Sequence, residues 1–121
     1  MTNALAALGE DYQNNIKSAF ENRWIDAFET EGKRSGAYSW GTYDSKPYVL
    51  LNHKNNLDSM FTMAHELGHS MHSLMTRKEQ PFVYGNYSIF VAEVASTTNE
   101  ALLNDYLLKT ETDEKKKKYI L

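Results

Sequence analysis

The first regular pattern in the chain is an apolar residue at every fourth position near its start. Residues at this spacing lie on one face of an α-helix, so the pattern predicts a helix over about Leu8–Glu31, which Gly32 would end. We expect the whole apolar stripe to belong to the hydrophobic core. Its members are Leu8, Tyr12, Ile16, Phe20, Trp24 and Phe28.

Two short runs of β-prone residues follow this helix. Ala37–Trp40 and Tyr48–Leu51 flank a polar turn at Tyr43–Lys46, and this arrangement predicts a β-hairpin. Pro47 would begin the second strand, where its missing N–H does least harm. The hairpin is the only β-structure that the pattern indicates.

Helical spacing returns in the second half of the chain. Asn56 is a suitable N-cap for a helix over about Leu57–Arg77, and Ser88 for a helix over about Ile89–Leu108. We see no repeat, no low-complexity stretch and no second domain. The predicted fold class is therefore mainly α with a small β-hairpin (α+β), and residues 1–121 are predicted to form a single domain.

A further helix is predicted at the end of the sequence. Thr112 would cap it, with Asp113 and Glu114 in its first turn. Four lysines follow at positions 115–118, and we expect them to form a solvated face. Because the apolar face of this helix has only begun where the sequence stops, we expect the chain to be a segment of a larger protein.

Composition and charge exclude several classes of protein. The 121 residues carry a net charge of −3 with both signs interspersed, which gives no electrostatic basis for binding nucleic acid or an anionic membrane. No apolar run approaches the roughly 18 residues needed to span a bilayer. The chain has no cysteine, which excludes disulfides and thiolate metal sites and fits a reducing compartment. We therefore expect a cytoplasmic protein.

The segment FTMAHELGHSMH concentrates ionisable side chains inside a predicted helix. His65 and His69 are four residues apart, so both project from the same helical face and can reach one metal ion. Glu66 borders that face and is placed to act as a general base on a metal-bound water. The spacing is the HExxH pattern of zinc peptidases. The alternative is a pair of solvent-facing histidines on an ordinary amphipathic helix.

Gly68 stands between the two histidines, in the middle of the predicted helix. A glycine at such a position costs about 1 kcal/mol relative to alanine, so it needs a structural reason. Close approach by another backbone or by a substrate would supply one.

A catalytic zinc usually has three protein ligands, so the motif needs one more. His72 cannot easily complete a tetrahedron from the same helix, and is expected to lie outside the ligand set or on the surface. His53 is expected to be a polar loop residue. The better candidate is Glu93, whose sequence neighbours are all apolar, because a buried carboxylate needs a cation. An Arg or Lys partner, or an exposed carboxylate, is the ordinary alternative for Glu93.

Three blocks of sequence carry a family resemblance: GKRSGAYSWGTY, FTMAHELGHSMHS and FVAEVASTTNEALL. Together they resemble the oligoendopeptidase F branch of the M3, or thimet-oligopeptidase-like, zinc metallopeptidases. The resemblance implies a gluzincin site with one Zn²⁺, in which His65, His69 and Glu93 are ligands and Glu66 is the catalytic base. It further implies the helical, deep-channelled M3 fold, oligopeptide substrates, and a cleft lined by residues 36–43.

The resemblance also leaves questions open. Family members are several times longer, and later helices carry the histidine and tyrosines associated with substrate binding, so the remaining segments or self-association could complete the cleft. Tyr84 and Tyr87 lie where they could reach it. Ser96, Asn99 and Glu100 follow Glu93 and could orient the histidines, although Glu100 could equally be a solvated helix residue.

The sequence allows three interpretations of function. The first is a zinc endopeptidase core that cleaves internal bonds of oligopeptides. The second is a catalytically incomplete fragment whose metal is structural, and the third is a metal-free helical interaction module.

Overall fold

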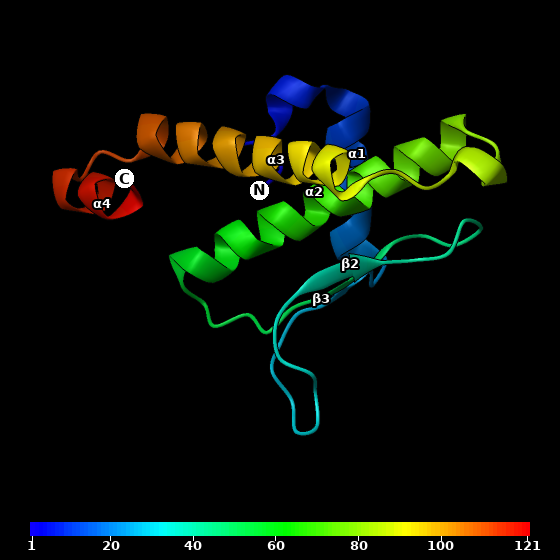
Figure 1. Ribbon diagram of the computed structural model, residues 1–121. Helices are drawn as coiled ribbons and strands as arrows, with labels where there is room; N and C mark the ends of the chain where they lie inside the picture. Colours follow the sequence, from blue (N-terminus) through cyan, green and yellow to red (C-terminus); the bar gives the residue numbers. More distant parts are fainter.

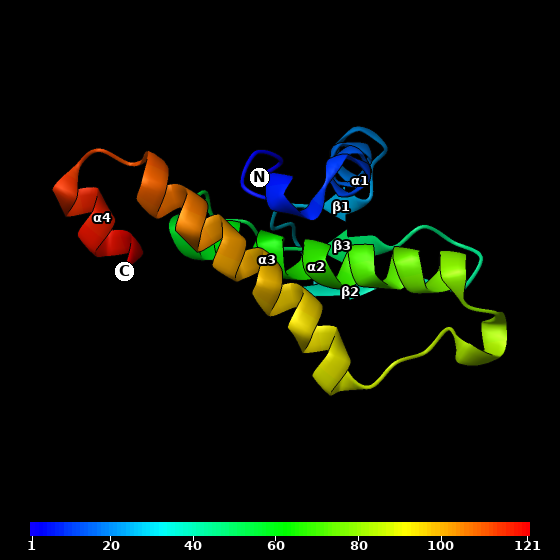
Figure 2. The same cartoon turned by 90° about the horizontal axis from the view of Figure 1, so that it is seen from above.

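The computed structural model describes residues 1–121 as a set of helices with a three-stranded sheet packed on one side of them (Figures 1 and 2). The longest helix, α2, is central: β2 and β3 contact it on one side, and α3 crosses it on another. In chain order the elements are η1 (Ala6–Leu8), α1 (Glu10–Glu21), β1 (Ile25–Asp26), β2 (Tyr38–Trp40), β3 (Tyr48–Leu50), α2 (Leu57–Glu79), η2 (Phe82–Tyr84), α3 (Ile89–Thr110) and α4 (Glu114–Ile120). The mainly helical α+β fold class is thus confirmed.

The first helix is much shorter than the predicted Leu8–Glu31. It ends at Glu21, and Arg23 adopts a positive φ of 56° that turns the chain. Trp24 remains in the core, but it does so beside the sheet, because the backbone carbonyl of Trp24 accepts a hydrogen bond from the Val49 N–H. A spacing of four is even, so it also fits one face of a strand. The stripe is also core only in part, since Ile16 and Trp24 are buried whereas Phe20 and Phe28 are 46 % and 61 % exposed.

The predicted hairpin is present and belongs to a larger sheet. β2 and β3 pair antiparallel, with Ser39 opposite Val49, and β1 pairs with β3 in parallel, with Ile25 opposite Val49. The strand order is β1-β3-β2. β2 is therefore an edge strand, and one edge of its backbone is free of strand partners.

The two helices of the second half occupy the predicted positions. The Asn56 side chain accepts a hydrogen bond from the Ser59 N–H at 2.9 Å and so caps α2, while the α2 residues Leu67 and Met71 are fully buried against the N-terminal segment. Ser88 precedes α3 as predicted, but its side chain makes no capping bond.

The last helix begins one residue later than the predicted cap implies. Asp113, and not Thr112, caps α4, since its carboxylate accepts a hydrogen bond from the Lys115 N–H at 2.8 Å. The predicted cap was wrong because the carboxylate at 113 is both a capping group and well placed for the helix dipole.

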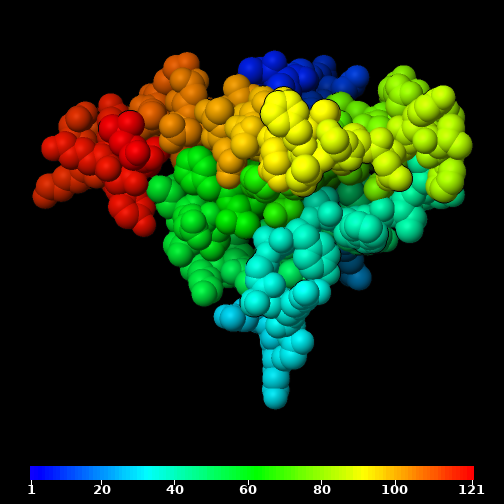
Figure 3. Space-filling view, viewed as in Figure 1, coloured from blue at the N-terminus to red at the C-terminus, as the bar shows by residue number.

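Large apolar side chains are exposed on η2, which connects α2 to α3, and on the first half of α3. Ile89 and Phe90 are 74 % and 77 % exposed, and the other members of this apolar surface are Phe82, Val83, Tyr84, Val91 and Val94. In Figure 3 the first turns of α3, in yellow, lie on the front of the molecule. No helix in the structure is both long and apolar enough to cross a membrane.

Candidate metal centre

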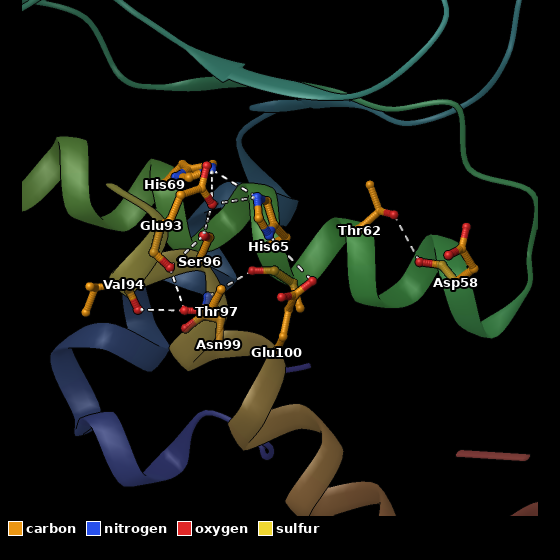
Figure 4. A network of polar contacts seen from close by, with 11 residues as sticks. Asp58, Thr62, His65, His69, Glu93, Val94, Ser96, Thr97, Asn99 and Glu100 are labelled. Atoms are coloured by element: carbon orange, nitrogen blue, oxygen red, sulfur yellow. Dashed lines mark hydrogen bonds and ion pairs between the residues drawn. The ribbon is translucent and has the colours of Figure 1, made fainter. Parts of the chain in front are cut away.

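The crossing of α2 and α3 brings three predicted ligands together. His65 and His69 extend from one face of α2, and Glu93 faces them from α3 (Figure 4). Each of the three offers a ligand atom, and these atoms all lie within 4.8 Å of one another. The structure thus places the side chains of residues 65, 69 and 93 together, although 24 residues of sequence separate His69 from Glu93.

Gly68 explains how the two helices come so close. A Cβ on Gly68 would lie 2.6 Å from the Cα of Ser96 and 2.8 Å from the carbonyl oxygen of Ala95. No side chain can be accommodated at such distances. The glycine predicted to mark a close backbone approach therefore marks the point where α2 and α3 touch, about one turn after His65 and immediately before His69.

The distances between the three ligand atoms bracket those of a tetrahedral zinc site and lie within about 0.2 Å of them. Nε2 of His65 lies 3.1 Å from Nε2 of His69, and Oε2 of Glu93 lies 3.4 Å and 3.8 Å from these two atoms, respectively. Ligands about 2.0–2.2 Å from an ion at tetrahedral angles are about 3.3–3.6 Å apart. Two imidazoles and a carboxylate are also the donor types of catalytic zinc sites. The residues therefore fit one zinc ion.

Glu93 differs in one respect from its predicted environment. Its side chain is 43 % exposed, because the apolar neighbours Phe90 and Val94 are themselves exposed instead of packed around it. The expectation of a buried carboxylate was wrong. Its orientation is nevertheless fixed, since the fully buried Ser96 donates a hydrogen bond from Oγ to Oε2 of Glu93 at 2.8 Å.

Polar residues farther along α3 hold the histidine-bearing helix. Oε1 of Glu100 lies 3.5 Å from Nδ1 of His65, so the carboxylate stands on the side of the ring away from the ligand atoms. The fully buried Asn99 donates to the carbonyl of Ala64 at 3.0 Å and accepts a hydrogen bond from the Tyr12 hydroxyl at 2.8 Å. This amide joins α1, α2 and α3 directly beside the first histidine.

The electrostatic surroundings favour neutral imidazole. Burial lowers the pKa of His69, and the neighbouring His65 lowers it further. A neutral ring is the form that binds metal. The low pKa of His69 is thus consistent with a role as ligand.

Glu66 is buried at the side of the same cluster. Only 7 % of the residue is exposed, and its Oε2 has no hydrogen-bond partner. Burial raises the pKa of Glu66, although the adjacent His65 opposes this shift. A carboxylate whose pKa is raised toward neutrality can both accept and return a proton.

A cleft of about 580 Å³ opens beside the three ligands. Edge strand β2 forms one wall and α2 with the start of α3 forms the other; residues 37–41 line it, as the family resemblance implied. Ser39 ties the two walls together, because its Oγ lies 2.8 Å from Oγ of Ser70 on α2. Ser70 in turn donates to the carbonyl oxygen of Glu66 at 3.0 Å.

The remaining candidates lie away from the ligand cluster. His72 is stacked on the ring of Tyr87, with 3.9 Å between centroids, and is not among the three converging residues. Tyr87 lines the cleft, whereas Tyr84 is exposed outside it. His53 accepts a hydrogen bond from the Asn55 N–H within its own loop, as expected of a polar loop residue.

Ser73 and Arg77 are among the cleft residues that the sequence did not indicate. Both line the cleft beyond His69, at successive steps of four along α2. The same spacing that identified the histidine pair, extended by two steps, would have found them.

A helical protein with an HExxH helix and a glutamate from the next helix has the layout of a gluzincin peptidase. The sequence matches Peptidase family M3 over residues 2–121, and the chain belongs to this family.

Three relatives show how far the similarity extends. Oligopeptidase PepF of Bacillus subtilis (strain 168) is 60 % identical over all 121 residues, which cover 18 % of that protein. The chromosomal oligoendopeptidase F of Lactococcus lactis subsp. cremoris is 57 % identical over a region that covers 93 % of this chain and 19 % of the relative's length. A crystal structure from Chlamydophila abortus, of a protein described as a candidate peptidase, superimposes with a TM-score of 0.91 at 48 % identity, covering 98 % of this chain and 20 % of that one. The chain thus spans about a fifth of the length of the curated relatives it matches.

Proposed function

We propose that residues 1–121 form a single domain that contains the catalytic core of a zinc-dependent endopeptidase. His65, His69 and Glu93 bind one Zn²⁺, and Glu66 is the general base. The observation that carries the proposal is the convergence of three ligand atoms at nearly tetrahedral spacing, with a second carboxylate, that of the buried Glu66, beside them. Membership of Peptidase family M3 supports the same chemistry.

The residues of the site have different roles in the proposed hydrolysis. Bound zinc supplies Lewis acidity, which polarises a carbonyl and makes water a stronger acid. Glu66 accepts the proton of the attacking water and delivers it to the departing amine. Ser96 and Glu100 hold Glu93 and His65 in the orientations that bind the ion.

We propose an oligopeptide as the substrate. The cleft is bordered by β2, whose outer edge has no strand partner, and an extended peptide can add to such an edge through main-chain hydrogen bonds. The names of the relatives, oligopeptidase PepF and oligoendopeptidase F, support peptides of limited length. The absence of cysteine supports a cytoplasmic location.

A Glu66→Gln exchange tests the assignment of the base. The amide keeps the size of the side chain but cannot accept a proton, so we expect hydrolysis of a fluorogenic oligopeptide to be lost while zinc content stays at one equivalent. Glu79→Gln is the matched control, since Glu79 is an exposed carboxylate on the same helix. Full activity of the Glu66→Gln chain would refute the assignment.

The same experiment separates the two other interpretations. A chain that retains one zinc but hydrolyses nothing, even before mutation, is a zinc-binding fragment with a structural metal, which would need the remaining segments or self-association for turnover. A chain that holds less than a tenth of an equivalent of zinc after addition of Zn²⁺ is a metal-free helical module. Loss of zinc in Glu93→Ala, but not in the exposed control Glu79→Ala, supports the third ligand.

A further inference from the structure

One cation in the cleft takes no part in the metal centre. Arg77 lies on α2 eight residues after His69, so two helical steps of four place both side chains on the same face. Both residues line the cleft of about 580 Å³. At a rise of about 1.5 Å per residue, the two Cα atoms are about 12 Å apart along the helix axis.

Arg77 has no acidic partner in the chain. Its Nη2 donates to the carbonyl oxygen of Gly41 at 2.7 Å, while Nη1 is buried and without a hydrogen-bond partner. The acids that share the cleft, Glu66 and Glu93, both stand at the metal centre. A buried guanidinium nitrogen normally has a hydrogen-bond partner or a counter-ion, and the place of Arg77 in the wall of the cleft makes its charge available to an anionic ligand.

The position of the guanidinium is fixed by the turn that follows β2. A Cβ on Gly41 would lie 2.9 Å from Nη1 of Arg77, so the bare backbone at 41 allows the guanidinium to lie against it. Together with the bond to the Gly41 carbonyl, this contact holds the charge in place before any ligand arrives. Such preorganisation lowers the entropic cost of binding.

Building on the peptidase function proposed above, we propose that Arg77 binds a carboxylate of the peptide substrate. An extended chain advances about 3.4 Å per residue, so the 12 Å between His69 and Arg77 corresponds to about three to four residues from the bond that is cut. The carboxylate is either the C-terminal main-chain group or an Asp or Glu side chain, and the guanidinium recognises both through charge-assisted hydrogen bonds.

Binding of matched peptides to the zinc-loaded Glu66→Gln chain tests this proposal without turnover. The probes are a dye-labelled octapeptide of Ala and Gly with a free C-terminus, the same peptide with a C-terminal amide, and the amide carrying one Glu. Fluorescence anisotropy should show that at least one carboxylate-bearing form binds about ten- to a hundredfold more tightly than the plain amide, as expected for a charge-assisted hydrogen bond.

Variants of Arg77 connect this preference to the residue. Arg77→Gln keeps a polar side chain with an N–H donor but removes the charge, and we expect it to abolish the preference. Arg77→Lys keeps the charge and should retain a reduced preference. Lys78→Gln, which removes an exposed charge from the neighbouring position, should leave the preference unchanged.

The outcomes distinguish the role of Arg77 from the peptidase function on which it rests. If the preference is confined to the free C-terminus, the ligand is the main-chain carboxylate; if it is confined to the Glu peptide, the ligand is an acidic side chain. Equal binding of all three peptides, or a preference that survives Arg77→Gln, overturns the role of Arg77 alone. No detectable binding of any peptide overturns the proposed peptidase function and the role of Arg77 with it.

An active chain gives a second readout. With amidated peptides in which a single Glu is moved one residue at a time, the bond that is cut should move by one residue in step. A cleavage position that ignores the Glu in parent chain and Arg77→Gln alike contradicts an acidic side chain as the ligand.

Discussion

Gly68 of α2 and Ser96 of α3 meet backbone against backbone, at a distance that leaves no room for a side chain. The contact lies between the two histidines on one helix and beside the hydroxyl that bonds Glu93 on the other. One close approach therefore sets the separation of all three ligand atoms.

Gly68→Ala should weaken zinc binding by separating the helices. The added methyl gains about 1 kcal/mol of helix propensity, but overpacking against the backbone of Ser96 costs about 1–3 kcal/mol. We expect lower stability in urea and a lower zinc affinity in a chelator competition titration. Lys78→Ala, an exposed site on the same helix, is the control, and an unchanged affinity in Gly68→Ala would contradict the role of the contact.

Ser96→Ala should reduce zinc affinity without removing a ligand. The Ser96 hydroxyl bonds Oε2 of Glu93, and the loss of such an outer contact typically costs about 10–100-fold in metal affinity. Thr97→Ala is the matched control, because the Thr97 hydroxyl bonds the main-chain carbonyl of Glu93 and not its carboxylate. Equal affinities of the two variants would count against an orienting role for Ser96.

The bond between Tyr12 and Asn99 should contribute to stability as a coupled pair. Tyr12→Phe leaves Oδ1 of the fully buried Asn99 without a donor and should cost about 1–3 kcal/mol. Asn99→Leu removes this bond and the bond to the Ala64 carbonyl, and should cost at least as much. The double variant should cost less than the sum of the two, because they remove the same bond. Urea unfolding of the four chains measures this coupling, and strict additivity would mean that the bond contributes nothing.

Tyr12 should also make the protein sensitive to alkali. Burial raises the pKa of Tyr12 above its usual value of 10.0, and the hydrogen bond to Asn99 opposes this only in part. Above about pH 10 the unfolded chain loses this proton while the folded chain keeps it, so the free energy of unfolding falls as pH rises; below that pH the stabilisation is fully present.

The measurement for this prediction is a difference between two chains. Zinc-free parent and Tyr12→Phe chains are unfolded in urea at a series of pH values from 8 to 11. The parent should lose stability more steeply above about pH 10, and parallel curves would exclude Tyr12 as the cause.

The sequence predicted the parts of the fold that depend on local pattern. HExxH on a helix and an isolated glutamate in an apolar stretch were enough to indicate residues 65, 69 and 93, which the structure brings together. Gly68 was identified as a close backbone approach because a mid-helix glycine is costly. These signals are visible in sequence because helical spacing fixes which side chains share a face.

Other features depend on contacts between distant segments and were not visible. The residues after Glu21 satisfy their backbone groups on β3 instead of continuing the helix, and periodicity alone could not decide between the two. The exposure of Glu93 depends on how Phe90 and Val94 are packed. Asn99 gave no sign that it would join three helices, since its partners lie 87 and 35 residues away.

The apolar surface around Ile89 and Phe90 has a practical consequence for anyone handling this chain. Such a surface lies next to the entrance of the cleft. It favours self-association of the protein at high concentration. Self-association would then cover the entrance of the cleft, and the measured binding of peptide would fall as the protein concentration rises. Dilution of the protein should therefore restore peptide binding that self-association has blocked, without any mutation.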